Sequence, residues 1–346
     1  SKNYLWPIVE GLNNELFEIF LFSDDETNQK EIHLDWLQFK KKKNFFDTSK
    51  LNYKKFLKLL YGLNLDIIFE CNGHTDKSRF EELSYRPAKK QGTFFNILGP
   101  SGFDFIDFIP IRKSTDTQKL TEMFKEKLVF FENYSSPNFS SYPKSPSEPP
   151  CINKKFITFG YFGGIHKVTK KMFLIWLKIL NANSNSKLYL KCEALDNEKV
   201  KYKILNKFKK ENIEKSRIIL NGISKTREDY LKCYNDIDIS FTTHPHNGGS
   251  TFIDSLIMGV PIFILNTNAR LSSQIGSYHL NKMNLNELIV NSYDDYFEKY
   301  LSLAENFKRI VSYKKTLRSR IIHSEWSNKS KNILEFEKLI KKVVNN

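Results

Sequence analysis

The stretch Asp236–Phe263 reads DIDISFTTHPHNGGSTFIDSLIMGVPIF, and it predicts a strand, a glycine loop and a helix in direct succession. Apolar residues over Ile237–Thr243 indicate a buried strand, and the loop Asn247–Thr251 follows it. The helix expected over Thr251–Met258 ends at Gly259, with a proline shortly after, which is ordinary helix-stop chemistry. Glycines let a ligand approach the backbone, and a helix start favours an anion such as a diphosphate. The stretch therefore predicts an α/β fold with an anion site at a helix start.

Side chains in and after this loop add hydrogen-bonding groups. Ser250 and Thr251 carry hydroxyl groups, and Asp254, about one turn into the helix, is placed to accept hydrogen bonds from ribose hydroxyls. The candidate nucleotide-binding residues are Asn247, Gly248, Gly249, Ser250, Thr251 and Asp254. An isolated NGGST loop is more often a solvated loop with a helix-capping hydroxyl, because short glycine motifs match by chance. The surrounding sequence has to decide between the two.

Strand and helix patterns alternate along the chain. In the first part we expect helices and strands at Leu5–Leu12, Phe17–Phe22, Tyr53–Gly62, Leu65–Cys71 and Gln91–Ile97. In the second part we expect strands at Phe156–Phe162, Leu188–Cys192, Arg217–Leu220 and Ile262–Leu265, and helices at Lys170–Asn181, Lys199–Asn212, Arg227–Tyr234 and Lys331–Val344. Such alternation predicts parallel sheets with right-handed crossovers.

A proline-rich segment divides the chain. Residues Ser135–Pro150 contain five of the eleven prolines, and proline restricts φ and removes a backbone donor. We therefore expect an N-terminal lobe over residues 1–134, a linker over 135–150, and a C-terminal nucleotide-binding lobe with a final helix over 151–346.

Composition is that of a globular protein, with 40% hydrophobic and 27% charged residues in 346. No membrane-spanning or signal-peptide pattern is present, so a cytoplasmic protein is the expectation. The four cysteines form no CxxC pair, which argues against a zinc site and a disulfide framework. The net charge of +15 fits nucleic acid as a partner, but the basic residues are scattered, and biased composition explains them better than a nucleic-acid role.

Three blocks, in order, resemble one family. The stretch Asp236–Phe263 is similar to the donor-binding motif of O-GlcNAc transferases and SPINDLY-like proteins, a strand followed by PYNGGTT, a helix containing Asp, and MGVPVV. ITFGYFGGIHKVTKKMFLIWLKIL, from Ile157 to Leu180, is similar to the family's VTFGSFNN strand and the helix after it. LDIIFECNGHT, the start of the block Leu65–Phe108, is similar to its DILVDLAGHT segment. The chain resembles the catalytic region of bacterial-type members, and no tetratricopeptide repeat is visible in it.

This resemblance implies a GT-B fold, in which two Rossmann-like lobes face a cleft. It also implies an inverting, metal-independent glycosyltransferase that needs no cofactor. The expected donor is UDP-GlcNAc, with GDP-fucose as the alternative, and the expected acceptor is a Ser or Thr hydroxyl of a protein or peptide. Membrane partners are not expected.

The resemblance also assigns site residues. Lys167 matches the family lysine that holds the leaving diphosphate, and His166 beside it joins the donor site. Lys225, or Arg227 nearby, is a candidate second cation, on a loose alignment. His74 matches a histidine on the acceptor side; a turn histidine bonded to nearby backbone is an equally good explanation.

Three departures from the family pattern are the reason for keeping an alternative function beside the glycosyltransferase. This chain begins after the family's first strand and its histidine, Gly163 and Gly164 replace amide side chains, and Gln274 stands where an arginine is usual. The alternative is a non-catalytic member of the same fold that binds a nucleotide or a protein.

Overall fold

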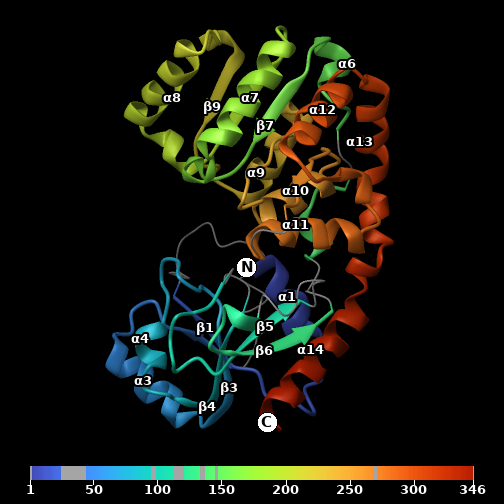
Figure 1. Cartoon of the computed structure of the whole chain (residues 1–346). Coiled ribbons are helices and arrows are strands. Elements are labelled where there is room, and N and C mark those ends of the chain that lie inside the picture. The colour runs from blue at the N-terminus through green and yellow to red at the C-terminus, as the bar shows by residue number, and fades with distance from the viewer. Residues whose placement is uncertain are drawn as a thin grey trace. The chain divides into compact units, whose positions relative to one another are not determined.

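The computed structural model describes residues 2–24, 44–94, 99–112, 121–132, 137–144, 147–267 and 271–345. The chain forms two compact units: Ser1–Phe139 together with Ser327–Asn346, and Ser140–Trp326 (Figure 1). The division between Phe139 and Ser140 lies inside the predicted linker. Each unit is an α/β structure built on parallel strands, which is the predicted class of fold.

The first unit is built on a parallel sheet in the order β3 (Leu65–Glu70), β4 (Ala88–Thr93), β5 (Phe108–Arg112) and β6 (Lys127–Phe131). A separate parallel pair joins β1 (Leu21–Ser23) to β2 (Phe45–Asp47), and the helices are α1 (Lys2–Gly11), α3 (Tyr53–Gly62), α4 (Phe80–Leu83) and α14 (Lys329–Val344). Since neighbouring residues of a strand face opposite sides of a sheet, β3 contributes to the cores on both faces of its sheet. Phe69 packs with α1 and α14, whereas Ile68 packs with α3 and α4.

Helix α14 is the last element of the chain but belongs to the first unit. Its residues Phe336, Leu339 and Val343 are buried in one core with Ile8 of α1. Figure 1 shows the red α14 beside the blue α1, and the backbone N–H of Asn13 donates to Glu337 Oε1 at 3.1 Å. The final helix therefore packs onto the first part of the chain, whereas the sequence analysis grouped it with residues 151–346.

The second unit contains a parallel sheet in the order β10 (Ile239–Ser240), β7 (Thr158–Tyr161), β8 (Lys187–Lys191) and β9 (Ile218–Asn221). A bridge from Ser240 to Ile262 continues it toward the parallel pair β11 (Ile264–Leu265) and β12 (Ile289–Val290). Its helices are α6 (Cys151–Lys154), α7 (Lys170–Ala182), α8 (Glu198–Lys210), α9 (Arg227–Lys232), α10 (Ser250–Ile257), α11 (Leu271–Lys282), α12 (Tyr293–Ala304) and α13 (Phe307–Ile322).

Local sequence explains where these helices begin. Thr169 caps α7 through its side chain, which accepts the N–H of Met172, and the apolar stripe of α7 is buried against the sheet.

The strand predicted over Ile237–Thr243 has only Ile239–Ser240 in the regular ladder. It is shorter because Thr242 bonds through other groups: its hydroxyl donates to Phe263 O at 2.7 Å and its N–H to Tyr296 Oη at 3.2 Å.

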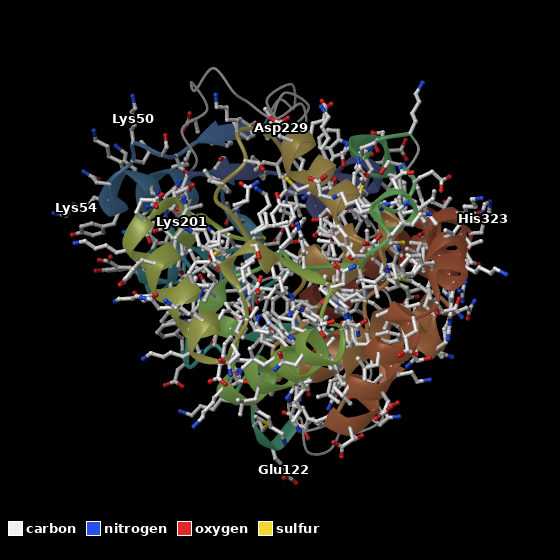
Figure 2. The ribbon with its side chains drawn as sticks, turned by 90° about the horizontal axis from the view of Figure 1, so that it is seen from above. Lys50, Lys54, Glu122, Lys201, Asp229 and His323 are labelled. Atoms are coloured by element: carbon white, nitrogen blue, oxygen red, sulfur yellow. The ribbon has the colours of Figure 1, made fainter. Side chains whose placement is uncertain are left out.

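The basic side chains are spread over many elements. Figure 2 labels Lys50 and the exposed Lys54 of α3 near the edge of the first unit. Within the described ranges no helix is both long enough and apolar enough to cross a membrane. All four cysteines are free thiols.

Candidate functional site

The glycine loop and the start of α10 form the centre of the candidate site. Gly248 has a φ of +80°, a conformation that L side chains rarely adopt, and a Cβ there would lie 2.9 Å from Thr251 Oγ1. Gly249 precedes the helix, and no side chain caps it. Gly249 and Ser250 are exposed. The first N–H groups of α10 have no intrahelical acceptor, so this helix start is open to an anion.

Asn247 anchors the loop from within the protein. Only 3% of it is exposed, and its Nδ2 donates to the carbonyl oxygen of Ser273 at 2.8 Å and, more weakly, to that of Leu265 at 3.5 Å. Its side chain therefore holds the loop against α11 and β11. A direct contact of this amide with a ligand stays a prediction.

We expect Asn247→Ala to lower the free energy of unfolding by about 1–2 kcal/mol, because two buried carbonyl groups lose their donor. Urea unfolding measures the change, and Asn291→Ala, at an exposed asparagine of the same unit, is the control. Equal stability of the two variants would show that the amide does not anchor the loop.

Lys167 lies next to this loop. It ends the short 3-10 turn Ile165–Lys167, which follows β7, and burial lowers the pKa of its amine. Burial also lowers the pKa of His246, and the positive charges of Lys167 and then His166 lower it further. His246 Nδ1 accepts the N–H of Gly248 at 3.0 Å, so this imidazole is bound to the glycine loop. A charge that affects His246, such as that of Lys167, is therefore close to the loop. The structure thus brings Lys167 and the exposed His166 together with the glycine loop.

Asp254 is buried in a cluster with an arginine and a tyrosine. Arg227 Nη1 donates to Asp254 Oδ2 at 2.8 Å, and a second guanidinium nitrogen donates to Oδ1. The hydroxyl of Tyr142 donates to the same Oδ1 at 2.6 Å. Burial by itself would lower the pKa of Arg227, but the charge of Asp254 and the hydrogen bonds to it raise that pKa. The expected ribose contact of Asp254 stays a prediction, and the structure gives this carboxylate protein partners.

The sequence did not single out Tyr142, and it named Arg227 only as an alternative to Lys225. Lys225 is exposed, whereas Arg227 is the cation that pairs with Asp254. Arg227 opens α9, whose N-cap Thr226 accepts the N–H of Asp229. The signal for Arg227 was a loose alignment with the family; nothing in the proline-rich segment pointed to Tyr142.

His74 lies in the first unit, in the turn after β3. Its ring is exposed and packs near Phe80 and Phe103, with ring centroids 5.3 and 5.8 Å apart. Glu70, buried at the end of β3, accepts the N–H of Asn72 at 3.1 Å and that of Gly73. Burial raises the pKa of Glu70, whereas these backbone donors lower it. Glu70 shapes the turn that presents His74, and the sequence analysis missed it.

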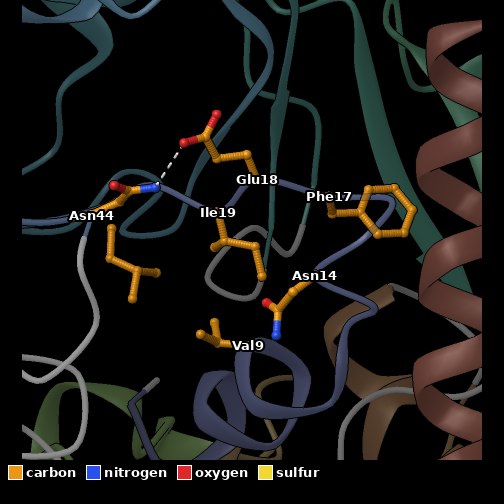
Figure 3. A pocket seen from close by; sticks show the side chains of 7 residues that line it. Val9, Asn14, Phe17, Glu18, Ile19 and Asn44 are labelled. Carbon is orange, nitrogen blue, oxygen red and sulfur yellow. Dashed lines mark hydrogen bonds between the residues drawn. The ribbon is translucent and has the colours of Figure 1, made fainter.

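One cavity of the first unit, of about 360 Å³, contains none of the expected site residues. Figure 3 shows Val9, Asn14 and Ile19 around it, and Asn44 donates to Glu18 Oε1 at 3.2 Å. Over the described ranges, His, Cys, Asp and Glu side chains form no group of three or more that would hold a metal ion.

The model of glycosyl transferase family 41 matches residues 151–336, which contain the glycine loop, Lys167, Arg227 and Asp254. The chain belongs to glycosyl transferase family 41. Among curated family relatives, the probable UDP-N-acetylglucosamine–peptide N-acetylglucosaminyltransferase SPINDLY of Hordeum vulgare is 29% identical over 279 residues, 79% of this chain and 29% of that protein. The corresponding SEC protein of Arabidopsis thaliana is 25% identical over 331 residues, 92% of this chain and 33% of that protein.

A solved structure shows the same fold. A mutant O-GlcNAc transferase of Thermobaculum terrenum superposes with a TM-score of 0.82 at 21% identity, covering 99% of this chain and 65% of that chain. The fold of this family 41 chain is therefore of the GT-B type, as the sequence predicted. The chain spans about a third of the length of the two curated relatives.

Proposed function

We propose that this chain is the catalytic region of a glycosyltransferase that moves a sugar from a nucleotide sugar to a hydroxyl of a protein acceptor. UDP-GlcNAc is the first proposed donor, which agrees with the names of the curated relatives, and GDP-fucose is the alternative. One observation carries the proposal: Lys167 lies close enough to His246, directly before the glycine loop that leads into the uncapped start of α10, for its charge to lower the pKa of that imidazole. A helix start and a cation together suit the diphosphate of such a donor.

The proposed reaction is an inverting displacement. The acceptor hydroxyl attacks the anomeric carbon, the bond from that carbon to the diphosphate oxygen breaks, and the hydroxyl proton passes to a base. Negative charge grows on the leaving diphosphate, and Lys167 with the N–H groups at Ser250 and Thr251 would stabilise it without requiring a metal ion. His74 is proposed on the acceptor side, where the buried Glu70 holds its turn.

A thermal-shift panel tests the donor. We expect UDP or GDP at about 100 times its dissociation constant to stabilise the protein by roughly 2.7 kcal/mol, because a ligand that binds only the folded state shifts the equilibrium. If UDP stabilises the protein, UDP-GlcNAc should also raise the melting temperature and GDP-fucose should not. If GDP stabilises it, the reverse is expected. Adenosine diphosphate is the control, and a shift by neither UDP nor GDP would reject a nucleotide-sugar donor.

A transfer assay with acceptor peptides separates the two candidate functions. Labelled sugar on a Ser or Thr hydroxyl supports the enzyme. If the full-length protein binds a nucleotide but transfers no sugar, it is the non-catalytic member. The observation that favours this alternative is that Gly163 and Gly164 stand where the family has amide side chains.

A further inference from the structure

Four partly exposed aromatic side chains form a strip on the first unit that starts beside His74. They are Tyr61 of α3, Tyr85 after α4, and Phe103 and Phe105 in the loop between β4 and β5. Tyr61 is 53% exposed and Tyr85 is 55% exposed, and the two phenylalanines are half-buried. Aromatic residues are enriched at binding surfaces, because they combine a large apolar area with few rotatable bonds. These four residues are called the aromatic strip below.

The part of the strip next to His74 consists of stacked rings. The centroid of the His74 ring is 5.8 Å from that of Phe103, and Phe103 stacks on Phe105 with centroids 4.9 Å apart and an interplanar angle of 20°. Both phenylalanines pack near the buried Phe80 of α4, with centroids 4.7 and 6.5 Å from it. These contacts fix the rings in the absence of a ligand, so binding would cost little side-chain entropy.

Hydrogen bonds to the backbone join the two tyrosines to this stack. Arg86 Nη1 donates to the carbonyl oxygen of Phe105 at 3.2 Å, and Tyr85 directly precedes Arg86. The hydroxyl of Tyr61 donates to the carbonyl oxygen of Tyr85 at 2.5 Å. The strip is therefore continuous from the turn of His74 to Tyr61.

The strip extends along the full length of the sheet. His74 lies in the turn after the C-terminal end of β3, whereas Tyr61 and Tyr85 precede the starts of β3 and β4, which pair through Leu65 and Ala88. Since β3 has 6 residues and a strand rises about 3.3 Å per residue, the strip spans roughly 20 Å. A polyproline II helix rises about 3.1 Å per residue, so roughly six or seven of its residues cover this length.

Ion pairs balance charges that border the strip. Each pair joins a basic side chain to an acidic one; the pairs are Arg86–Asp107, Lys89–Asp66 and Lys125–Asp104. Apolar contacts with the rings should therefore decide what binds there. Aromatic surfaces suit proline-rich segments, whose polyproline II conformation is already extended and loses little entropy on binding.

We propose that the aromatic strip docks an extended segment of the protein acceptor, rich in proline and aliphatic residues, that continues from the hydroxyl group placed at His74. The inference rests on the proposed function and adds to it the class of acceptor sequence. The acceptor is chosen as the occupant because the strip is continuous with the turn of His74. A chain whose Ser or Thr lies at His74 meets Phe103 first, then Phe105, and reaches the tyrosines last.

Fluorescence anisotropy with labelled peptides and the full-length protein tests the docking without requiring turnover. Each peptide carries one Ser and a Pro-Leu-Pro repeat of about three, seven or twelve residues, with the repeat after the Ser in one set and before it in the other. In one of the two sets we expect the affinity to rise roughly tenfold to a hundredfold from three to seven residues, and less than about threefold from seven to twelve. Gly-Ser peptides of the same lengths are the control. Equal affinities for three and seven residues in both sets would overturn the proposal.

Substitutions locate the bound peptide on the strip. Tyr85→Ser and Tyr61→Ser should each weaken the seven-residue peptide by roughly tenfold and the three-residue peptide by less than about twofold, because the shorter one does not reach the tyrosines. Phe103→Leu keeps the apolar contact with Phe80 but removes the flat ring, and it should weaken both peptides. Tyr202→Ser is the matched control, because Tyr202 is a 68% exposed tyrosine of the second unit. Wild-type affinity of Tyr85→Ser for the seven-residue peptide would contradict the proposal.

Transfer kinetics separate docking from a structural role. With the seven-residue peptide as acceptor, Tyr85→Ser should raise KM by roughly tenfold and change kcat by less than about twofold, as expected when binding alone is lost. A fall in kcat together with the melting temperature would show a structural role instead and overturn the proposal. A dimer in sedimentation that Tyr85→Ser dissociates would show that a second copy covers the strip, which also contradicts it.

The two levels of the proposal fail in different ways. If the wild-type protein binds the seven-residue peptide with the expected length dependence but transfers no sugar, the proposed function fails and the docking surface stands. If it transfers sugar and the strip variants bind the peptides as the wild-type protein does, only this inference fails.

Discussion

Lys167→Ala is expected to cut turnover by roughly 10²–10³, or about two to four kcal/mol of barrier, while the fold survives. In an inverting transfer, negative charge grows on the diphosphate as its bond to the sugar breaks. A cation aimed at that oxygen stabilises the transition state more than the ground state, and this difference lowers the barrier. The start of α10 supplies only about half a charge, so Lys167 should carry a large share of the effect.

Steady-state kinetics of the full-length protein with its preferred donor, alongside a melting curve, measure this effect. Lys170→Ala, at an exposed lysine in the first turn of α7, is the control and should leave kcat unchanged. Turnover of Lys167→Ala within a few-fold of wild type, at an unchanged melting temperature, would show that Lys167 is a surface lysine without the proposed role.

The Lys167 prediction has a pH dependence. Burial lowers the pKa of Lys167 from its ordinary value, so its positive charge is present below that lowered pKa and is lost as the pH rises through it. Turnover should therefore fall on the alkaline side, at a lower pH than an exposed lysine would cause. Lys167→Ala should lose this alkaline decline, and a decline that persists in the variant would assign it to another group.

Lys314→Met is expected to raise the free energy of unfolding at pH 7 by about 2–3 kcal/mol. The side chain of Lys314, on α13, is buried, and its Nζ has no hydrogen-bond partner among the described residues. Burial lowers its pKa from 10.5 to about 8, although the charges of Asp238 and Glu148 oppose the change. A shift of this size corresponds to about 3 kcal/mol, and methionine keeps the apolar stem without the buried charge.

The sign of this effect gives a pH window. Between pH 8 and 10.5 the unfolded chain holds the Lys314 proton and the folded protein does not, so folding stability rises with pH in that window. Below the folded pKa both states are protonated, and the full cost of the charge is present. The advantage of Lys314→Met over wild type should therefore be largest below pH 8 and shrink as the pH approaches 10.5.

Urea unfolding at several pH values measures the difference between the two proteins. Lys315→Met is the matched control, because Lys315 is the exposed neighbour on the same helix. It should change stability by less than about 0.5 kcal/mol. If Lys314→Met is less stable than wild type at pH 7, the attraction between the amine and Asp238 stabilises the fold by more than the burial of the amine destabilises it.

Helices and their boundaries were the best predicted features of the fold. The predicted helix Tyr53–Gly62 has the bounds of α3, and Lys170–Asn181 differs from α7 by one residue. Both helices are predicted by nearby residues. Each has an apolar stripe at helical spacing, and a capping side chain, Asn52 or Thr169, directly precedes it. The strands were predicted less well: the ladder around β4 begins at Ala88, before the expected Gln91, because strand bounds depend on the neighbouring strands β3 and β5.

The candidate site divides in the same way. The glycine loop, the start of α10 and Lys167 could be named from the sequence, because each belongs to a short motif whose chemistry is local. The partners of Asp254 could not, since Tyr142 is 112 residues away and Arg227 is 27 residues away. Glu70 gave no motif of its own, and only the turn that it holds shows what it does.

The sequence by itself determined the alternation of helices and strands, the glycine loop before α10 and the family. These properties follow from hydrophobic periodicity, glycine conformation and helix capping, which act over a few residues. Only the tertiary structure decided that the carboxylate of Asp254 is buried and that Arg227 is its exposed partner. It also decided that Lys314 is buried without a hydrogen-bond partner in the described part of the chain. The physical reason is that desolvation and ion pairing depend on which distant segments pack together, and residue type alone does not encode that.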